Sequence, residues 1–216
     1  MAVDNKLGQR LAVSQSRMRW DNLFDDLESQ LEQELTAEEV DLQAEEERLR
    51  LARLGIRDRL RALSTASTTD GCILRLLLAD GSRVAVAPAT FGRDWIAGEL
   101  LEESGRRPQC IVALDGIDAV MLTRSQVLQS LDASGAEEST GALSARLGLQ
   151  FVLRDLCRRR QAIDLWLRDG RVHGTIDRVG RDHVDVAVHE AGTPRRESAV
   201  GEYRIVRLGQ IVLARL

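Results

Sequence analysis

The chain has 216 residues, a formal net charge of −4 and an apolar fraction of 44%, which allow one or two globular domains. No apolar run is long enough to span a membrane, and no apolar stretch near the N-terminus resembles a secretory signal. The three cysteines are single, without CxxC or zinc spacing. We therefore expect a reduced, cytoplasmic protein, and the near-exclusive use of arginine over lysine suggests a bacterium with a GC-rich genome.

The N-terminal region is predicted to be an acidic helical arm over residues 1–47, with Met18 as a second candidate start. Leucine recurs at every fourth position over 21–35, which indicates a helix with one apolar stripe. Thr36-x-x-Glu39 is typical of a capping box that opens a second helix, expected over 37–63. Residues 21–47 hold twelve carboxylates and no arginine or lysine. This run is either a solvated helix face or a segment that docks on a basic surface, its own or a partner's. The leucines of the stripe are Leu23, Leu27, Leu31 and Leu35.

Two parts of the chain after this arm repeat one pattern in the same order. The Leu-x-Leu-x-Asp-Gly sequence at 76–81 recurs at 165–170, and the Gly-Arg-Asp sequence at 92–94 recurs at 180–182. Upstream and downstream matches extend each repeat to about 70 residues, which suits paired small domains better than a solenoid. We expect units at 48–131 and 142–216, joined by a linker at 132–141 that is rich in Ser, Gly, Ala and Glu.

Each repeat is predicted to contain a helix followed by five short strands. The first has strands over 72–78, 83–87, 95–101, 109–113 and 117–122, then a helical turn over 123–131. The second has a helix over 142–160 and strands over 163–168, 171–178, 183–189, 203–207 and 210–216. Asp80-Gly81 should form a hairpin turn, and Pro88 should end the second strand. Trp95 and Trp166 fall on strands and are predicted core residues.

The second repeat resembles the Sm-like family of small β-barrels, the Hfq and LSm proteins. Residues 167–176 are similar to the family's first motif, in which a glycine, here Gly174, lets a strongly bent second strand form. The valines of 184–188 resemble the third strand, and 205–211 are similar to the family's second motif. The resemblance implies an α+β fold with two tandem helix-plus-five-strand small β-barrel units behind the acidic arm.

The same resemblance implies candidate RNA-binding residues. In the family, RNA bases rest in the loop between the second and third strands and in the last tight turn. Two extra loop residues are needed to place Asp182 on the family's aspartate. Arginine would supply phosphate contacts and base stacking, and glycine would let the backbone approach closely. The candidates are Arg181, Asp182, Arg207, Gly209 and Gln210, with weaker equivalents at Arg93, Asp94, Asp115 and Gly116.

No pattern in the sequence indicates catalysis, a metal or a cofactor. GxSxG, P-loop and dinucleotide fingerprints do not occur. His183 and His189 flank one strand and lie too far apart along it to share a metal, although a cross-strand pair of His173 with His183 is conceivable. We therefore predict a non-enzymatic binding protein with no cofactor and no small-molecule substrate.

Two hypotheses for its function remain. The first is an RNA-binding regulator of Sm-like type, whose acidic arm packs on the repeats or on a neighbouring subunit and competes with RNA for the basic loops. The second is a protein adaptor or scaffold that recruits a partner, or self-associates, through the leucine-striped helix and binds no nucleic acid. The first depends on charge and the second on buried apolar area.

Overall fold

The computed structural model describes residues 27–28, 39–66, 71–132, 143–193 and 195–216. The chain separates into two compact units, Met1–Arg53 and Leu54–Leu216. In the first unit, residues 39–53 form a helix whose side chains are exposed apart from that of half-buried Leu51. No helix among the described residues is both long and apolar enough to cross a membrane.

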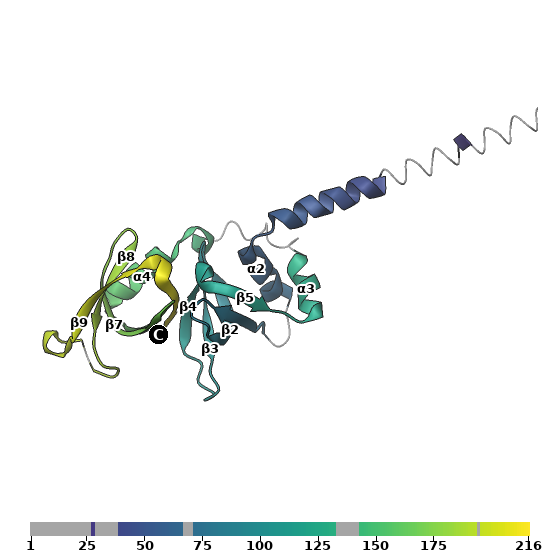
Figure 1. Cartoon of the computed structure of the whole chain (residues 1–216). Helices are drawn as coiled ribbons and strands as arrows, with labels where there is room; N and C mark the ends of the chain where they lie inside the picture. Colours follow the sequence, from purple (N-terminus) through teal and green to yellow (C-terminus); the bar gives the residue numbers. More distant parts are fainter. Residues whose placement is uncertain (1–26, 29–38, 67–70, 133–142, 194) are drawn as a thin grey trace, which may run out of the picture. The chain divides into compact units, whose positions relative to one another are not determined.

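The second unit is built on one antiparallel sheet of ten strands (Figure 1). The order of the strands is β5-β1-β2-β3-β4-β10-β6-β7-β8-β9. The fold class is therefore α+β, as predicted. The strands are β1 (Leu74–Leu78), β2 (Arg83–Phe91), β3 (Trp95–Leu101), β4 (Gln109–Ala113), β5 (Ile117–Met121), β6 (Ala162–Leu167), β7 (Gly170–Val179), β8 (His183–Val188), β9 (Glu202–Arg207) and β10 (Ile211–Arg215).

Three α-helices and four 3₁₀ helices accompany this sheet. In Figure 1, α2 and α3 lie beside the strands of the first repeat and α4 beside those of the second. A capping box at Thr123 starts α3, which lies where a helical turn was predicted. The helices are α2 (Ile56–Ala66), α3 (Arg124–Leu131), α4 (Leu149–Arg159), η1 (Leu114–Gly116), η2 (Leu143–Arg146), η3 (Glu197–Ala199) and η4 (Leu208–Gln210).

Both long helices predicted at the start of a repeat are interrupted. The helix expected over 37–63 breaks at Leu54 and Gly55, and the one expected over 142–160 breaks at Leu147 and Gly148. Glycine has no side chain to restrict its backbone, so it weakens a helix interior. The Ala-Arg-Leu-Gly sequence that the repeats share thus marks the residues just before α2 and α4, rather than the middle of a helix.

The two halves of the sheet have the same internal order. We call residues 54–132 the first half and residues 143–216 the second half. In each half the fifth strand pairs with the first, and the first to fourth strands follow in sequence. The second strand also shifts register at the same place in both halves, between Pro88 and Thr90 in β2 and between Ile176 and Arg178 in β7. The prediction that Pro88 ends its strand is wrong, because β2 continues past it to Phe91 through this irregularity.

The helix of each half holds the loop between the second and third strands in the same way. Arg57 of α2 donates from Nε to the carbonyl oxygen of Gly92 at 2.6 Å. Gln150 of α4, 93 positions later, donates from Nε2 to the carbonyl oxygen of Gly180. Each of these glycines also donates its N–H, over 2.8 Å, to the carbonyl oxygen three residues on. The sequence repeat therefore corresponds to a repeat in three dimensions.

The second and third strands approach each other closely in both halves, but the glycine at this place is on the second strand in one half and on the third strand in the other. In the second half a Cβ on Gly174 of β7 would clash with the carbonyl oxygen of Ala187 on β8. In the first half the glycine is Gly98 of β3, and a Cβ there would clash with the carbonyl oxygen of Ala87 on β2. Glycine is needed where two backbones come this close.

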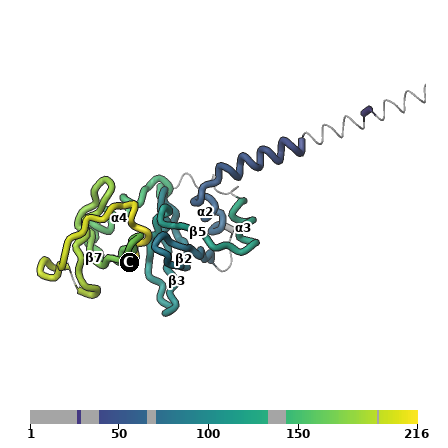
Figure 2. Tube along the Cα trace, viewed as in Figure 1, coloured from purple at the N-terminus to yellow at the C-terminus, as the bar shows by residue number. Residues whose placement is uncertain are grey.

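The halves meet where β4 pairs with β10, so that they share one sheet and complete each other's cores. Leu213 lies opposite Val112 in this pairing. Trp95 and Ile111 of the first half belong to the core of the second. Figure 2 shows the C-terminus of the chain at this meeting point. Trp166, Val212 and Leu213 of the second half in turn belong to the core of the first.

This shared core predicts that the halves unfold together. Leu213 is fully buried, so Leu213→Ala should lower the free energy of unfolding by about 2–5 kcal/mol. Urea unfolding followed by circular dichroism should show a single transition shifted to lower urea. Leu128→Ala, at an exposed position on α3, is the matched control and should change the midpoint little. Two separate transitions in the Leu213→Ala protein would contradict joint unfolding.

Candidate interaction surface at the end of the sheet

Strand β9 forms one end of the sheet, with no strand on its outer side in the described part of the chain. All its residues except Val206 are exposed. Ile205 is 76% exposed and Tyr203 is 60% exposed, although both are large and largely apolar. A sheet edge with exposed apolar side chains and unpaired backbone groups is a template for pairing with another strand.

A hollow of about 570 Å³ lies beside β9, and we call it the β9 hollow. Its apolar part is formed by the buried residues Leu167, Val172 and Val206. Its other residues are mostly exposed and polar, three of them arginines. A concave surface with an apolar floor and a charged rim suits a ligand that is both apolar and anionic. The remaining lining residues are Asp169, Gly170, Arg171, Arg204, Ile205, Arg207 and Gln210.

The three arginines of the β9 hollow differ in what holds them. The guanidinium of Arg171 lies 3.8 Å from the ring centroid of Trp166, a cation–π contact. Arg204 forms an ion pair with Glu202. Arg171 and Arg207 form no ion pair with a carboxylate among the residues that the structure describes. Residues 143–216 contain fourteen arginines and nine carboxylates, a formal charge of +5. The surface therefore carries positive charge that its own carboxylates do not neutralise.

Several of the sequence-predicted site residues gather next to this hollow. The backbone N–H of Leu208 donates to the carbonyl oxygen of Asp182 at 2.8 Å, which holds the loop after β7 against the turn after β9. A hydrogen bond from His183 lowers the pKa of the Asp182 carboxyl, and the charge of nearby Arg207 acts in the same direction. Arg207 and Gln210 line the hollow, and the carbonyl oxygen of Gly209 accepts from Arg168. Arg181 is exposed in the same loop as Asp182.

The equivalent residues of the first half lie in a different environment, because the junction with the second half uses them. The Asp94 carboxylate accepts from the backbone N–H of Leu149, the first residue of α4, at 2.6 Å. The backbone N–H of Arg93 and the indole N–H of Trp95 both donate to the carbonyl oxygen of Leu147. Asp94 thus caps a helix of the other half. Arg93 and Asp94 were predicted to lie in a loop accessible to RNA, because nothing in the sequence indicates their contact with the start of α4.

The turn between the fourth and fifth strands of the first half is also used internally. The carbonyl oxygen of Asp115 accepts from Arg168 at 2.5 Å. Gly116 is buried, and a Cβ on it would clash with Val212 of β10. In the corresponding turn of the second half Gly209 and Gln210 are exposed, and a Cβ on Gly209 would meet nothing within 4 Å.

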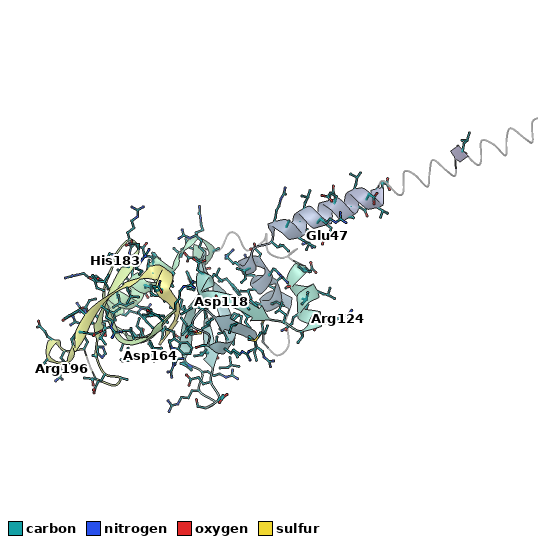
Figure 3. The ribbon with its side chains drawn as sticks, in the orientation of Figure 1. Glu47, Asp118, Arg124, Asp164, His183 and Arg196 are labelled. Atoms are coloured by element: carbon teal, nitrogen blue, oxygen red, sulfur yellow. The ribbon has the colours of Figure 1, made fainter. Side chains whose placement is uncertain are left out.

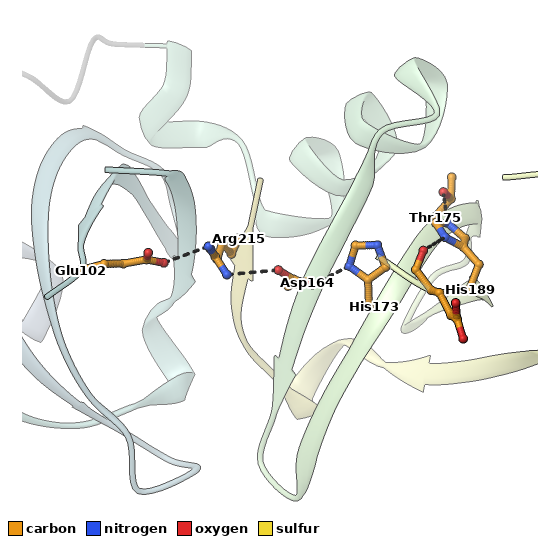
Figure 4. Close-up of polar contacts among 7 residues, drawn as sticks. Glu102, Asp164, His173, Thr175, His189 and Arg215 are labelled. Carbon is orange, nitrogen blue, oxygen red and sulfur yellow. Dashed lines mark hydrogen bonds and ion pairs between the residues drawn. The ribbon is translucent and has the colours of Figure 1, made fainter. Parts of the chain in front are cut away.

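Two of the three histidines, His173 and His189, belong to a polar chain shown in Figure 4. Asp164 accepts from Arg215 at 3.4 Å and lies 2.5 Å from Nδ1 of His173. Arg215 also pairs with Glu102, so this chain links the two halves. His173 meets the ring of His189 edge to face, which corrects the conceivable pairing with His183. The described residues contain no group of His, Cys, Asp or Glu side chains able to hold a metal ion.

The remaining predicted features concern the core and the arm. Trp95 and Trp166 are buried, as predicted. Burial raises the pKa of the Cys110 thiol to about 11, so this cysteine stays protonated at neutral pH and acts as a small core residue. In the leucine stripe, Leu27 is exposed, and the other three leucines lie outside the described residues.

The Asp94 cap predicts a measurable contribution to stability. Asp94→Ala removes the acceptor at the start of α4 and should lower the free energy of unfolding by about 1–2 kcal/mol. Asp169→Ala, at an exposed aspartate in the β6–β7 turn, is the control and should change stability by less than about 0.5 kcal/mol. Urea unfolding of both variants measures the difference. Equal effects would mean that Asp94 does not stabilise α4.

Comparison of the chain with models of protein families, with curated proteins and with solved structures gave no match.

Proposed function

We propose that this chain is a non-catalytic interaction protein, an adaptor or scaffold, whose binding surface is the end of the sheet formed by β9. The observation that supports this proposal is Ile205, an isoleucine exposed on an unpaired edge strand beside a hollow with an apolar floor. Residues of this kind are usually covered by a partner, because pairing buries apolar area and satisfies the edge backbone groups together.

The chemistry of this end also suits a macromolecular partner. Tyrosine and arginine are enriched at protein interfaces, and β9 exposes Tyr203, Arg204 and Arg207 next to Ile205. This proposal replaces the leucine-striped helix with β9 as the principal binding surface of the adaptor.

Several features support the proposal that the halves are Sm-like units. Each half places a helix before five strands, shifts register in its second strand and has a 3₁₀ turn between its last two strands. These similarities concern the fold, and fold alone does not determine function. The binding surface is therefore argued from its own residues.

A photo-crosslinking amino acid at position 203 tests the proposed function. In cells of the source organism, we expect the full chain with this substitution to form discrete adducts with a protein, identified by mass spectrometry. The same amino acid at position 128, exposed on α3 away from both β9 and its hollow, is the control and should form none. Absence of protein adducts at position 203 would overturn the proposal.

RNA binding is the second candidate function, favoured by Arg171 and Arg207, which lack carboxylate partners among the described residues. If the chain binds RNA there, affinity for a single-stranded oligonucleotide, measured by fluorescence anisotropy, should fall steeply with salt. Arg207→Ala should then weaken binding and lower the slope of log affinity against log salt by about 0.7 for one phosphate contact. Arg124→Ala on α3 is the control. No measurable binding at low salt would exclude this function.

A further inference from the structure

A second hollow, of about 340 Å³, lies at the opposite end of the sheet, where α2 meets β5. We call it the α2 hollow. Six of its seven lining residues are apolar, and Arg59 is the single charged residue among them. The other lining residues are Leu54, Ile56, Leu60, Leu63, Val120 and Leu122.

The α2 hollow corresponds to a surface that is covered in the second half. Ile56, Leu60 and Leu63 of α2 stand 93 positions before Leu149, Leu153 and Leu156 of α4. These three leucines pack in one core with Trp95, Ile111 and Ala113 of the first half. Ile56 is 43% exposed, whereas Leu149 is 8% exposed. The two helices thus carry matching apolar residues, and Leu60 and Leu63 are as buried as Leu153 and Leu156. The difference lies at Ile56, which the described chain leaves exposed.

The β9 hollow has the same relation to the first half. Its floor residues Leu167, Val172 and Val206 correspond to Leu78, Val84 and Val112 of the first half. In that half they pack in one core with Trp166, Val212 and Leu213, which the second half contributes. Within the described part of the chain, the β4–β10 junction forms once, and the two hollows are the corresponding surfaces that it leaves uncovered.

We propose that a second copy of this chain covers each of these hollows, so that the β9 end of one copy docks on the α2 and β5 end of the next. This proposal rests on the proposed function of β9 as an interaction surface. β9 would pair with β5 of the next copy in the register of β4 with β10, which places Val206 opposite Ala119. Ile205, the counterpart of Ile111, then enters the α2 hollow and loses its exposure to water.

The proposed contact between copies would repeat the helix cap that Asp94 forms at the start of α4. Asp94 accepts from the backbone N–H of Leu149 at the internal junction. Asp182 is the counterpart of Asp94, and Ile56 is the counterpart of Leu149. The side chain of Asp182 is 77% exposed in the single copy, and its carboxylate lies 2.9 Å from Nδ1 of neighbouring His183. The first N–H groups of a helix need acceptors from outside the helix. In the proposed contact Asp182 of one copy accepts from Ile56 of the next.

The charges at the two ends are complementary. Beyond the pair of Leu213 with Val112, the next residues of β10 and β4 are Val212 and Ala113. Their counterparts are Asp118 on β5 and Arg207 on β9. Both side chains are exposed, and Asp118 is labelled on the first half in Figure 3. Docking in this register would bring the Asp118 carboxylate near Arg207, which has no carboxylate partner among the described residues, so high salt should weaken the contact.

Two variants, each blocked at one end, test the proposal. Ile205→Asp blocks the β9 end, and Ile56→Asp blocks the α2 end and sets its carboxylate against Asp182. In sedimentation velocity the wild-type chain should grow with concentration beyond a dimer, and each variant alone should stay near the 24.0 kDa of one copy. An equal mixture should form a heterodimer of twice that mass and nothing larger. Leu128→Asp is the control and should behave as the wild type.

Charge reversal tests the register. Arg207→Asp should weaken association, and mixing it with Asp118→Arg should restore it. Every contact between the two variants then has one positive and one negative residue at positions 118 and 207. Circular dichroism confirms that all variants are folded before they are compared.

Several results would overturn the proposal: a wild-type chain that stays monomeric at every concentration, a mixture of the two end variants that does not associate, or a dimer formed by Ile56→Asp alone. The last would indicate a symmetric contact between β9 ends. Adducts at position 203 with a different protein, together with a monomeric wild type, would retain the interaction function and exclude self-assembly. Loss of both would reject the two proposals together.

Discussion

The pairing of β4 with β10 is the interaction on which the rest of the structure depends. Without it, Trp95 and Ile111 would be exposed on the first half, and Val212 and Leu213 on the second. Neither half could bury its apolar surface alone, although each has a complete set of five strands. The Asp94 cap and the contacts of Arg168 and Arg215 all lie around this pairing. The two repeats are thus joined by a shared core and not merely by a linker.

The sequence repeat was a sound basis for predicting the elements, because their order and approximate bounds follow from periodicity and turn residues. It could not predict that the halves join through β4 and β10. Alternation shows which face of a strand is buried but not which strand lies beside it. The helix breaks at Gly55 and Gly148 coincide with a Leu-Gly pair that both repeats contain. Because the apolar spacing continues on either side of each pair, one continuous helix was predicted there, and that prediction is wrong. Proline ordinarily ends a strand, but at Pro88 the register shift between β2 and β3 accommodates it and β2 continues.

The candidate site was predicted in part. The resemblance to the Sm-like family pointed to Arg207 and Gln210, which line the β9 hollow, and to Asp182 beside it. It missed Ile205 and Tyr203, because an apolar residue on a strand is ordinarily assigned to the core. A signal was present: Ile205 matches Ile111, whose strand is covered by β10, whereas no strand of the described chain covers β9. Exposure of this kind depends on which strands are neighbours, and so on the same pairing that sequence alone leaves open.

The differences between the covered junction and the exposed ends have a physical reason. At the covered junction β4 and its following turn contain Cys110, Ala113 and Gly116, all small and buried. The corresponding residues at the β9 end are Arg204, Arg207 and Gln210. The internal junction forms within one chain, so it loses no translational freedom and can be wholly apolar. An end that spends time in water must resist indiscriminate pairing, and charged side chains on an edge strand serve that purpose. The arginines surround the apolar floor of the hollow, and their charge would favour a partner with an opposing negative charge.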